Sequence, residues 1–179
     1  MYIAIIIAVI VLFLVFFWIG TSNNFKRKTV KIDEALSGIE VAMTKRYDML
    51  TKLLDTVKSF AAHEKDLFTK VINLRRGMPV EDLNKASEEM DTMSSKLFAV
   101  AEAYPELRSA EVFRELQAGI RDAEEHLQAA RRLYNSSVSA FNTAVAVFPS
   151  SIVAGSQHLE KKEFFTAEET KKNDVKINI

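Results

Sequence analysis

The chain has 179 residues, and its 24 basic and 24 acidic side chains give a formal net charge of +0 and a pI of about 6.9. This balance provides no overall field that would attract nucleic acid or another polyanion. The absence of cysteine excludes disulfides, thiolate zinc sites, a catalytic thiol and a cysteine-linked lipid anchor. Five glycines and three prolines, in a chain rich in Ala, Glu, Lys, Leu and Arg, indicate long helices rather than sheets.

The N-terminal segment from Tyr2 to Ile19 is apolar without interruption, and no charged side chain occurs from Met1 to Asn24. As a helix this segment spans about 27 Å, close to the roughly 30 Å of a bilayer's hydrocarbon core. A cleaved signal peptide is the alternative, but the segment is too long and has neither a basic start nor a convincing cleavage site. We therefore predict a retained transmembrane anchor over residues 1–22, with Tyr2 and Ile3 at one end and Trp18 and Ile19 at the interface of the other.

Basic residues after the span predict its orientation. Only the terminal amine precedes the span, whereas Lys26, Arg27, Lys28 and Lys31 follow it before the first acid, Asp33. The positive-inside rule then places the span in the cytoplasmic membrane, with the N-terminus outside and the following domain in the cytoplasm. The same cluster could also bind anionic headgroups, at about 1 kcal/mol per residue.

A heptad pattern predicts that the next helix has one apolar seam. Its members follow one another in alternating steps of three and four residues: Leu36, Ile39, Met43, Arg46, Leu50, Leu53, Val57, Phe60, Glu64, Leu67, Val71 and Leu74. Gly77-Met78-Pro79 interrupts the pattern. A second helix is predicted over residues 80–103, ending before Pro105 because the residue before a proline is pushed out of the α region.

The clearest helix is predicted from about 110 to 148, with Ser109 as its N-cap and Glu111 in its first turn. Its seam includes the aromatic series Tyr134, Phe141 and Phe148, which is assigned to the core, and the helix closes at Phe148-Pro149. In the tail from Ser150 to Ile179 we expect a short amphipathic segment and then disorder from about Lys171.

These elements predict an all-α fold, in which an N-terminal transmembrane helix is followed by an antiparallel bundle of three to four long helices. An unbroken helix from Asn24 to Arg76 would reach about 80 Å, whereas residues 80–103 would return only about 36 Å. A break around Ser59–Glu64 would give two nearly equal antiparallel helices, although the uninterrupted heptad argues against it. The predicted domains are the anchor at 1–22, the bundle at 23–154 and the tail at 155–179.

Patterns for catalytic, cofactor or metal sites fail at their required positions. His63 begins a zincin-like motif, but its second ligand is replaced by Leu67, and the acid that a di-iron site needs three residues before His126 is Ala123. The five glycines never form a phosphate-binding loop. We therefore expect no enzyme, no cofactor and no metal.

Polar residues on the helical seams are more informative. Arg46 and Glu64 occupy heptad positions, and a second polar stripe runs beside the apolar seam of the last helix: Gln117, Glu124, Arg131, Asn135 and Asn142. A charge that faces a seam is costly unless it is paired. Antiparallel pairing places Arg46 within a turn of Glu124, so we predict that these two form an ion pair that sets the register. Glu64 and Arg131 are further candidates for buried pairs, and the alternative for Arg46 is that its side chain reaches the bundle edge.

Three blocks of residues carry a family resemblance. The first includes Ala35, Ile39, Val41, Met43 and Lys45-Arg46-Tyr47-Asp48; the second is Glu102-Ala103-Tyr104-Pro105 with Leu107-Arg108; and the third includes Glu124, Arg131-Arg132, Tyr134-Asn135, Phe141-Asn142-Thr143 and Phe148-Pro149-Ser150. With these motifs the chain resembles the LemA family over nearly its whole length after the span. It departs from the family at Thr51-Lys52, where Pro-Asn is usual, and at Ser22-Asn23, where Tyr-Asn is usual.

The resemblance implies a bacterial, N-terminally anchored helical bundle without established catalytic activity. Members look like partners of membrane processes; some lie beside membrane-embedded zinc proteases of the heat-shock type, and relatives occur among magnetosome membrane proteins. The leading hypothesis is a scaffold or adaptor in contact with the lipid bilayer. It would form a homo-oligomer or dock to another membrane protein, for example one of these zinc proteases, and it would not bind nucleic acid. The alternatives are a membrane-remodelling or lipid-organising protein, which would use the basic cluster and the amphipathic tail, and a signalling or enzymatic module.

Overall fold

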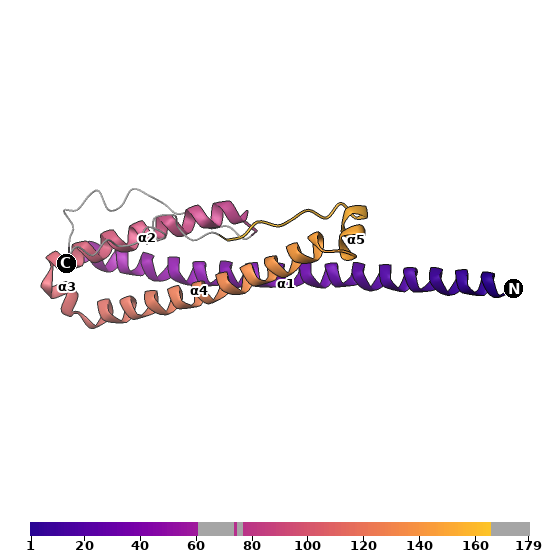
Figure 1. The fold of residues 1–179 in the computed structure, drawn as a ribbon. Coiled ribbons are helices and arrows are strands. Elements are labelled where there is room, and N and C mark those ends of the chain that lie inside the picture. The colour runs from indigo at the N-terminus through magenta and orange to yellow at the C-terminus, as the bar shows by residue number, and fades with distance from the viewer. Residues whose placement is uncertain (61–73, 75–76, 166–179) are drawn as a thin grey trace, which may run out of the picture. The chain divides into compact units, whose positions relative to one another are not determined.

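The structure, a computed structural model, describes residues 1–60, 74 and 77–165. Every regular element in these residues is a helix: α1 (Tyr2–Phe60), α2 (Val80–Ala103), α3 (Pro105–Ser109), α4 (Glu111–Ala146) and α5 (Ser150–Ser156) (Figure 1). The predicted all-α class is confirmed. Glu64, the residues of the predicted break after Phe60, and the tail after Phe165 lie outside the described residues.

Helix α1 joins the apolar span to the heptad segment in one element of 59 residues. The predicted boundary between the anchor and the bundle lies at residue 22, and α1 runs through this position without a break. A helix satisfies its own backbone hydrogen bonds in lipid and in water alike, so leaving a membrane requires no interruption. Among the described helices, α1 alone is long and apolar enough to cross a membrane by itself; α4 and α5 pass the same test only when taken together, and they are bent by 91°.

The chain forms two compact units. The first unit contains Met1–Leu36 and Arg132–Phe164, and the described residues of the second unit are 37–60, 74, 77–131 and 165. Both α1 and α4 contribute residues to each unit, and the units are described separately below.

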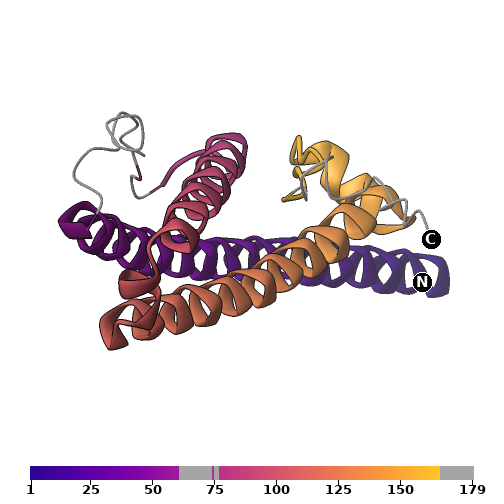
Figure 2. The same cartoon turned by 90° about the vertical axis from the view of Figure 1, so that its left-hand side faces the viewer.

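In the second unit, apolar seams of three helices form the core. On α1 the seam is buried from Ile39 to Val57, whereas Phe60 at the end of the helix is exposed. The seam of α2, whose bounds match the prediction, buries Leu83, Met90 and Leu97, and the seam of α4 buries Phe113, Ile120, Ala123 and Leu127. Figure 2 shows α3 connecting α2 to α4 at one end of this unit.

The short helix α3 was not predicted. Pro105 begins it, at a position where the fixed φ of proline and its missing N–H are tolerated. Leu107 is fully buried and docks the helix in the core. Ser109 is the last residue of α3, and its hydroxyl donates to the carbonyl of Glu106 at 2.9 Å. The prediction of Ser109 as the N-cap of the following helix is therefore wrong, because α4 begins at Glu111.

In the first unit, the early part of α1 packs against the end of α4. The rings of Phe25 and Phe141 meet edge to face with centroids 5.8 Å apart, and Tyr134, Val138 and Val153 are also buried. The assignment of Phe148 to the core is wrong, because this side chain is 76% exposed. Helix α4 ends at Ala146 and the chain turns into α5, so Phe148 no longer lies on the seam of α4.

The described part of the tail returns along α4 without forming a helix after Ser156. The side chain of Asn142 holds it through two hydrogen bonds of 2.8 Å, one to the carbonyl and one from the N–H of Lys162. These bonds satisfy polar backbone groups of a segment that has no helix to satisfy them.

Candidate functional site

The most unusual feature of the second unit is the buried guanidinium of Arg46, which is 4% exposed. It donates to the carboxylate of Asp91 on α2, and its Nη1 lies 3.0 Å from Oε2 of Glu124 on α4. The two carboxylates keep 24% and 30% of their side-chain surface exposed. Arg46 therefore links three helices through two acids that remain partly hydrated, an arrangement that offsets the cost of burying its charge.

The structure thus brings together Arg46 and Glu124, and it adds Asp91, which the heptad pattern does not predict. The available signal for Asp91 was its position directly after Met90, a residue of the α2 seam. The neighbouring Gln128 donates to the other oxygen of Glu124 at 2.7 Å, which fixes the orientation of this carboxylate.

Contacts on either side of Arg46 define the antiparallel register of α1 and α4 in this unit. Lys45 is paired with Asp122, and an added Cβ at Gly119 would lie 3.1 Å from Sδ of Met49. The hydrogen bond from Lys45 lowers the pKa of the Asp122 carboxyl. Because both side chains of this pair are well exposed, it contributes little to stability.

Arg131 forms a second polar junction between α4 and α2. Its guanidinium donates to the hydroxyl of Ser87, which is buried, and its Cζ lies 4.8 Å from the centroid of the Phe165 ring. This cation–π contact packs Phe165 against α4 within the second unit. Glu64, the other predicted candidate for a buried pair, lies outside the described residues.

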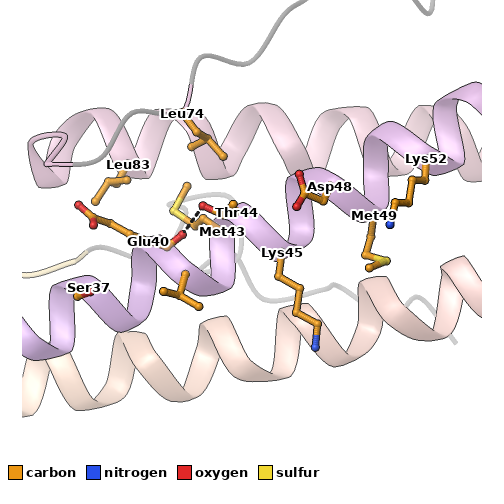
Figure 3. Close-up of a pocket in the computed structure, with 11 residues that line it drawn as sticks. Ser37, Glu40, Met43, Thr44, Lys45, Asp48, Met49, Lys52, Leu74 and Leu83 are labelled. Carbon is orange, nitrogen blue, oxygen red and sulfur yellow. Dashed lines mark hydrogen bonds between the residues drawn. The ribbon is translucent and has the colours of Figure 1, made fainter.

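A surface hollow of about 530 Å³ lies along α1 of the second unit (Figure 3). Its lining combines the apolar Met43, Leu74 and Leu83 with charged side chains of both signs, including Glu40 and Lys45. Glu40 accepts a hydrogen bond of 2.8 Å from the backbone N–H of Gly77, whose φ of +76° suits glycine. The hollow therefore presents a surface that mixes apolar and charged side chains.

The described residues contain no group of three or more His, Cys, Asp or Glu side chains that could hold a metal ion. The Nδ1 atom of His126 lies 2.8 Å from the carbonyl oxygen of Asp122, one turn earlier in the same helix.

The residues predicted to contact the membrane lie on the surface of α1. Tyr2, Ile3, Trp18 and Ile19 are all exposed, and so are Lys26, Arg27 and Lys31, whereas Lys28 is half-buried. No part of the most apolar 18-residue window of α1 is buried within the protein. This surface matches an apolar solvent better than water.

The remaining motif residues shape the ends of α2 and α4. Tyr104 and Pro105 form the junction between α2 and α3, and Phe148-Pro149 forms the junction between α4 and α5. Tyr134 donates from its hydroxyl to the carbonyl of Glu163 at 3.2 Å. Burial raises the pKa of this hydroxyl, and the negative charges of Glu163 and Asp33 raise it further. Asn135 is half-buried on the same helix.

Comparison with known proteins identifies the family that this chain matches. A model described as the LemA family matches residues 35–179. Protein LemA of Metamycoplasma hominis is 26% identical over 165 residues, which cover 89% of this chain and 75% of that protein. Magnetosome protein MamQ of Magnetospirillum gryphiswaldense is 26% identical over 70 residues, which cover 39% of this chain but only 26% of that protein.

Proposed function

Because the chain belongs to the LemA family, we propose that it is a membrane-anchored, non-enzymatic scaffold that self-associates or binds another membrane protein through its helices. Family membership and the apolar N-terminal helix suggest a helical, membrane-associated protein. The proposal adds to this a scaffold role, self-association and no catalytic activity.

The observation that carries the proposal is the composition of α1. One helix holds an exposed apolar span and, further along, a buried seam that organises α2 and α4 around Arg46. The polar side chains that meet at Arg46 come from three helices and bind one another, and the proposal assigns them a role in packing. In this proposal the membrane holds α1 while the outer surfaces of the bundle contact the partner.

The orientation is also part of the proposal. Lys26, Arg27 and Lys31 are exposed directly after the span, as residues that remain at the cytoplasmic surface would be. We therefore place the N-terminus outside and the rest of the chain in the cytoplasm. A membrane-embedded zinc protease is one candidate partner.

Amine-reactive crosslinking of the full chain in native membranes tests the scaffold role. We expect either a ladder of homo-oligomers or one defined heterologous band, which mass spectrometry would identify. Light scattering of the detergent-solubilised complex would then give its stoichiometry. Recovery of monomer at every crosslinker concentration would contradict the proposal.

A second candidate is a lipid-organising protein, favoured by the exposed basic side chains beside the span. The matched variant replaces Lys26, Arg27 and Lys31 with Gln in the full chain. If lipid organisation is the function, the wild type enriches phosphatidylglycerol over phosphatidylcholine in purified nanodiscs and the variant does not. Equal lipid compositions for the two proteins would reject this candidate.

A further inference from the structure

The corner between α4 and α5 in the first unit exposes three large apolar side chains within six residues. They are Val147, Phe148 and Ile152, with exposed fractions of 51%, 76% and 59%. Outside the N-terminal span, Phe148 is the most exposed large apolar side chain among the described residues. A cluster of this kind in a water-facing position is unfavourable unless another apolar phase covers it.

The position of the corner along α1 identifies that phase. Tyr134 is near Asp33 and Phe141 packs on Phe25, so α4 runs antiparallel to α1 in this unit. Five more helical residues advance about 7.5 Å, which brings Ala146 level with approximately Gly20. Beyond the corner, Gln157 donates to the hydroxyl of Ser22 at 2.8 Å. The corner therefore lies beside the end of the apolar span, where Trp18 and Ile19 are found.

The direction of α5 fits the same location. It makes an angle of 91° with α4, so it runs across the direction of the span rather than along it (Figure 1). Val153 and Ala154 are buried against the unit, while Ile152 faces outwards. A short element that lies across the end of a span and presents apolar side chains outwards has the geometry of a segment in the membrane interface.

We propose that the α4–α5 corner is a second membrane contact, in which Phe148 and its two apolar neighbours enter the lipid interface on the side where α1 leaves the bilayer. The aromatic ring of Phe148 would lie at the depth of Trp18, and the exposed Lys26 and Arg27 would lie at the headgroups just above it. The inference rests on the proposed anchoring of α1, and it adds a site that the span itself does not include.

The absence of cysteine from the chain allows a direct test with single labelled positions. Phe148→Cys is labelled with an environment-sensitive fluorophore, and the full chain is reconstituted into vesicles of phosphatidylcholine and phosphatidylglycerol that contain lipids with a quencher near the headgroup. Leu133→Cys is the matched control, because Leu133 is an exposed apolar side chain as well and lies on α4 about 20 Å before the corner. Trp18, the single tryptophan, reports separately on the anchor through quenching by brominated acyl chains.

If the corner enters the interface, the label at Phe148→Cys shifts its emission to shorter wavelength and is quenched by the shallow lipid quencher, while the label at Leu133→Cys is not. These results must persist when the protein is diluted in lipid. Quenched Trp18 with an unquenched label at Phe148→Cys would overturn the inference while leaving the anchor intact. A blue-shifted but unquenched label, or a shift that disappears on dilution, would assign the corner to a protein partner or a second copy and also overturn it. Unquenched Trp18 would instead reject the anchoring on which both proposals depend.

Discussion

Arg46 carries a positive charge into a packed helical seam, where Asp91 and Glu124 bind it. The energetics are asymmetric, because the arginine is buried while both acids retain contact with water. Removing the acids leaves a buried charge without its partners, whereas removing the arginine leaves two acids that can hydrate.

This asymmetry predicts the effect of substitutions. The double variant Asp91→Asn, Glu124→Gln should lose about 2–3 kcal/mol of unfolding free energy, and Arg46→Met should lose less than about 1 kcal/mol, because Met fills a similar volume without a charge. Urea unfolding of the full chain in detergent, followed by helical circular dichroism, measures both. An Arg46→Met variant as unstable as the double variant would contradict the argument. An unchanged fold and oligomeric state in Arg46→Met would show that the ion pair does not set the register.

Tyr134 predicts a pH dependence in the first unit. Its folded-state pKa is raised by burial and by the charges of Glu163 and Asp33, so the neutral hydroxyl is favoured in the folded protein. Its contribution is therefore fully present below the unfolded pKa of about 10 and is lost as the pH rises through the higher folded pKa.

The matched variant is Tyr134→Phe. It should lose about 0.5–1.5 kcal/mol at neutral pH, because the hydrogen bond to the Glu163 carbonyl is absent. Above pH 10 the difference between variant and wild type should shrink, since only the wild type has this hydroxyl to titrate. Unfolding midpoints measured at pH 7 and at several pH values above 10 test this, and a constant difference would contradict it.

At the scale of the elements, close approach of α1 and α4 in the second unit occurs at two glycines. A Cβ at Gly38 would meet Cβ of Ala130 at 3.9 Å, an ordinary contact, whereas a Cβ at Gly119 would meet Sδ of Met49 at 3.1 Å. Both glycines lie inside helices, where alanine has the higher propensity.

We therefore expect Gly38→Ala to raise the unfolding free energy by about 0.5–1 kcal/mol. Gly119→Ala should gain less, because the flexible side chain of Met49 must move before the same propensity is realised. Thermal unfolding of the two single variants beside the wild type provides the measurement. A larger gain at Gly119 than at Gly38 would show that the approach of the two helices is looser than the structure indicates.

At the scale of the whole molecule, the orientation across the membrane can be tested because the chain has no cysteine of its own. Two single-cysteine variants are compared: Tyr2→Cys at the start of α1, and Glu125→Cys on the exposed face of α4. In intact cells, only the Tyr2→Cys variant should react with a membrane-impermeant maleimide. Both should react after the cells are opened. Labelling of Glu125→Cys in intact cells would place the bundle outside and reject the proposed orientation.

Much of this protein is determined by local pattern. The uninterrupted apolar run determined the span, the period of the seams determined α2 and the core positions of α1 and α4, and the cost of an unpaired charge pointed to Arg46 and an acid on the facing helix. These features depend on neighbouring residues of one helix, or on the pairing of two long helices, so the sequence alone contains them.

Only the tertiary structure decided where elements end and which partners meet. Asp91 meets Arg46 because α2 docks beside α1. The helix α3 is held by the burial of Leu107, and Phe148 is exposed because the chain turns after Ala146. Helical periodicity carries no information about a turn between helices or about the third helix that reaches a side chain. Helix ends and third-helix partners depend on contacts between residues that are distant in the chain. These contacts form only when the helices pack together, and they then outweigh local helix propensity.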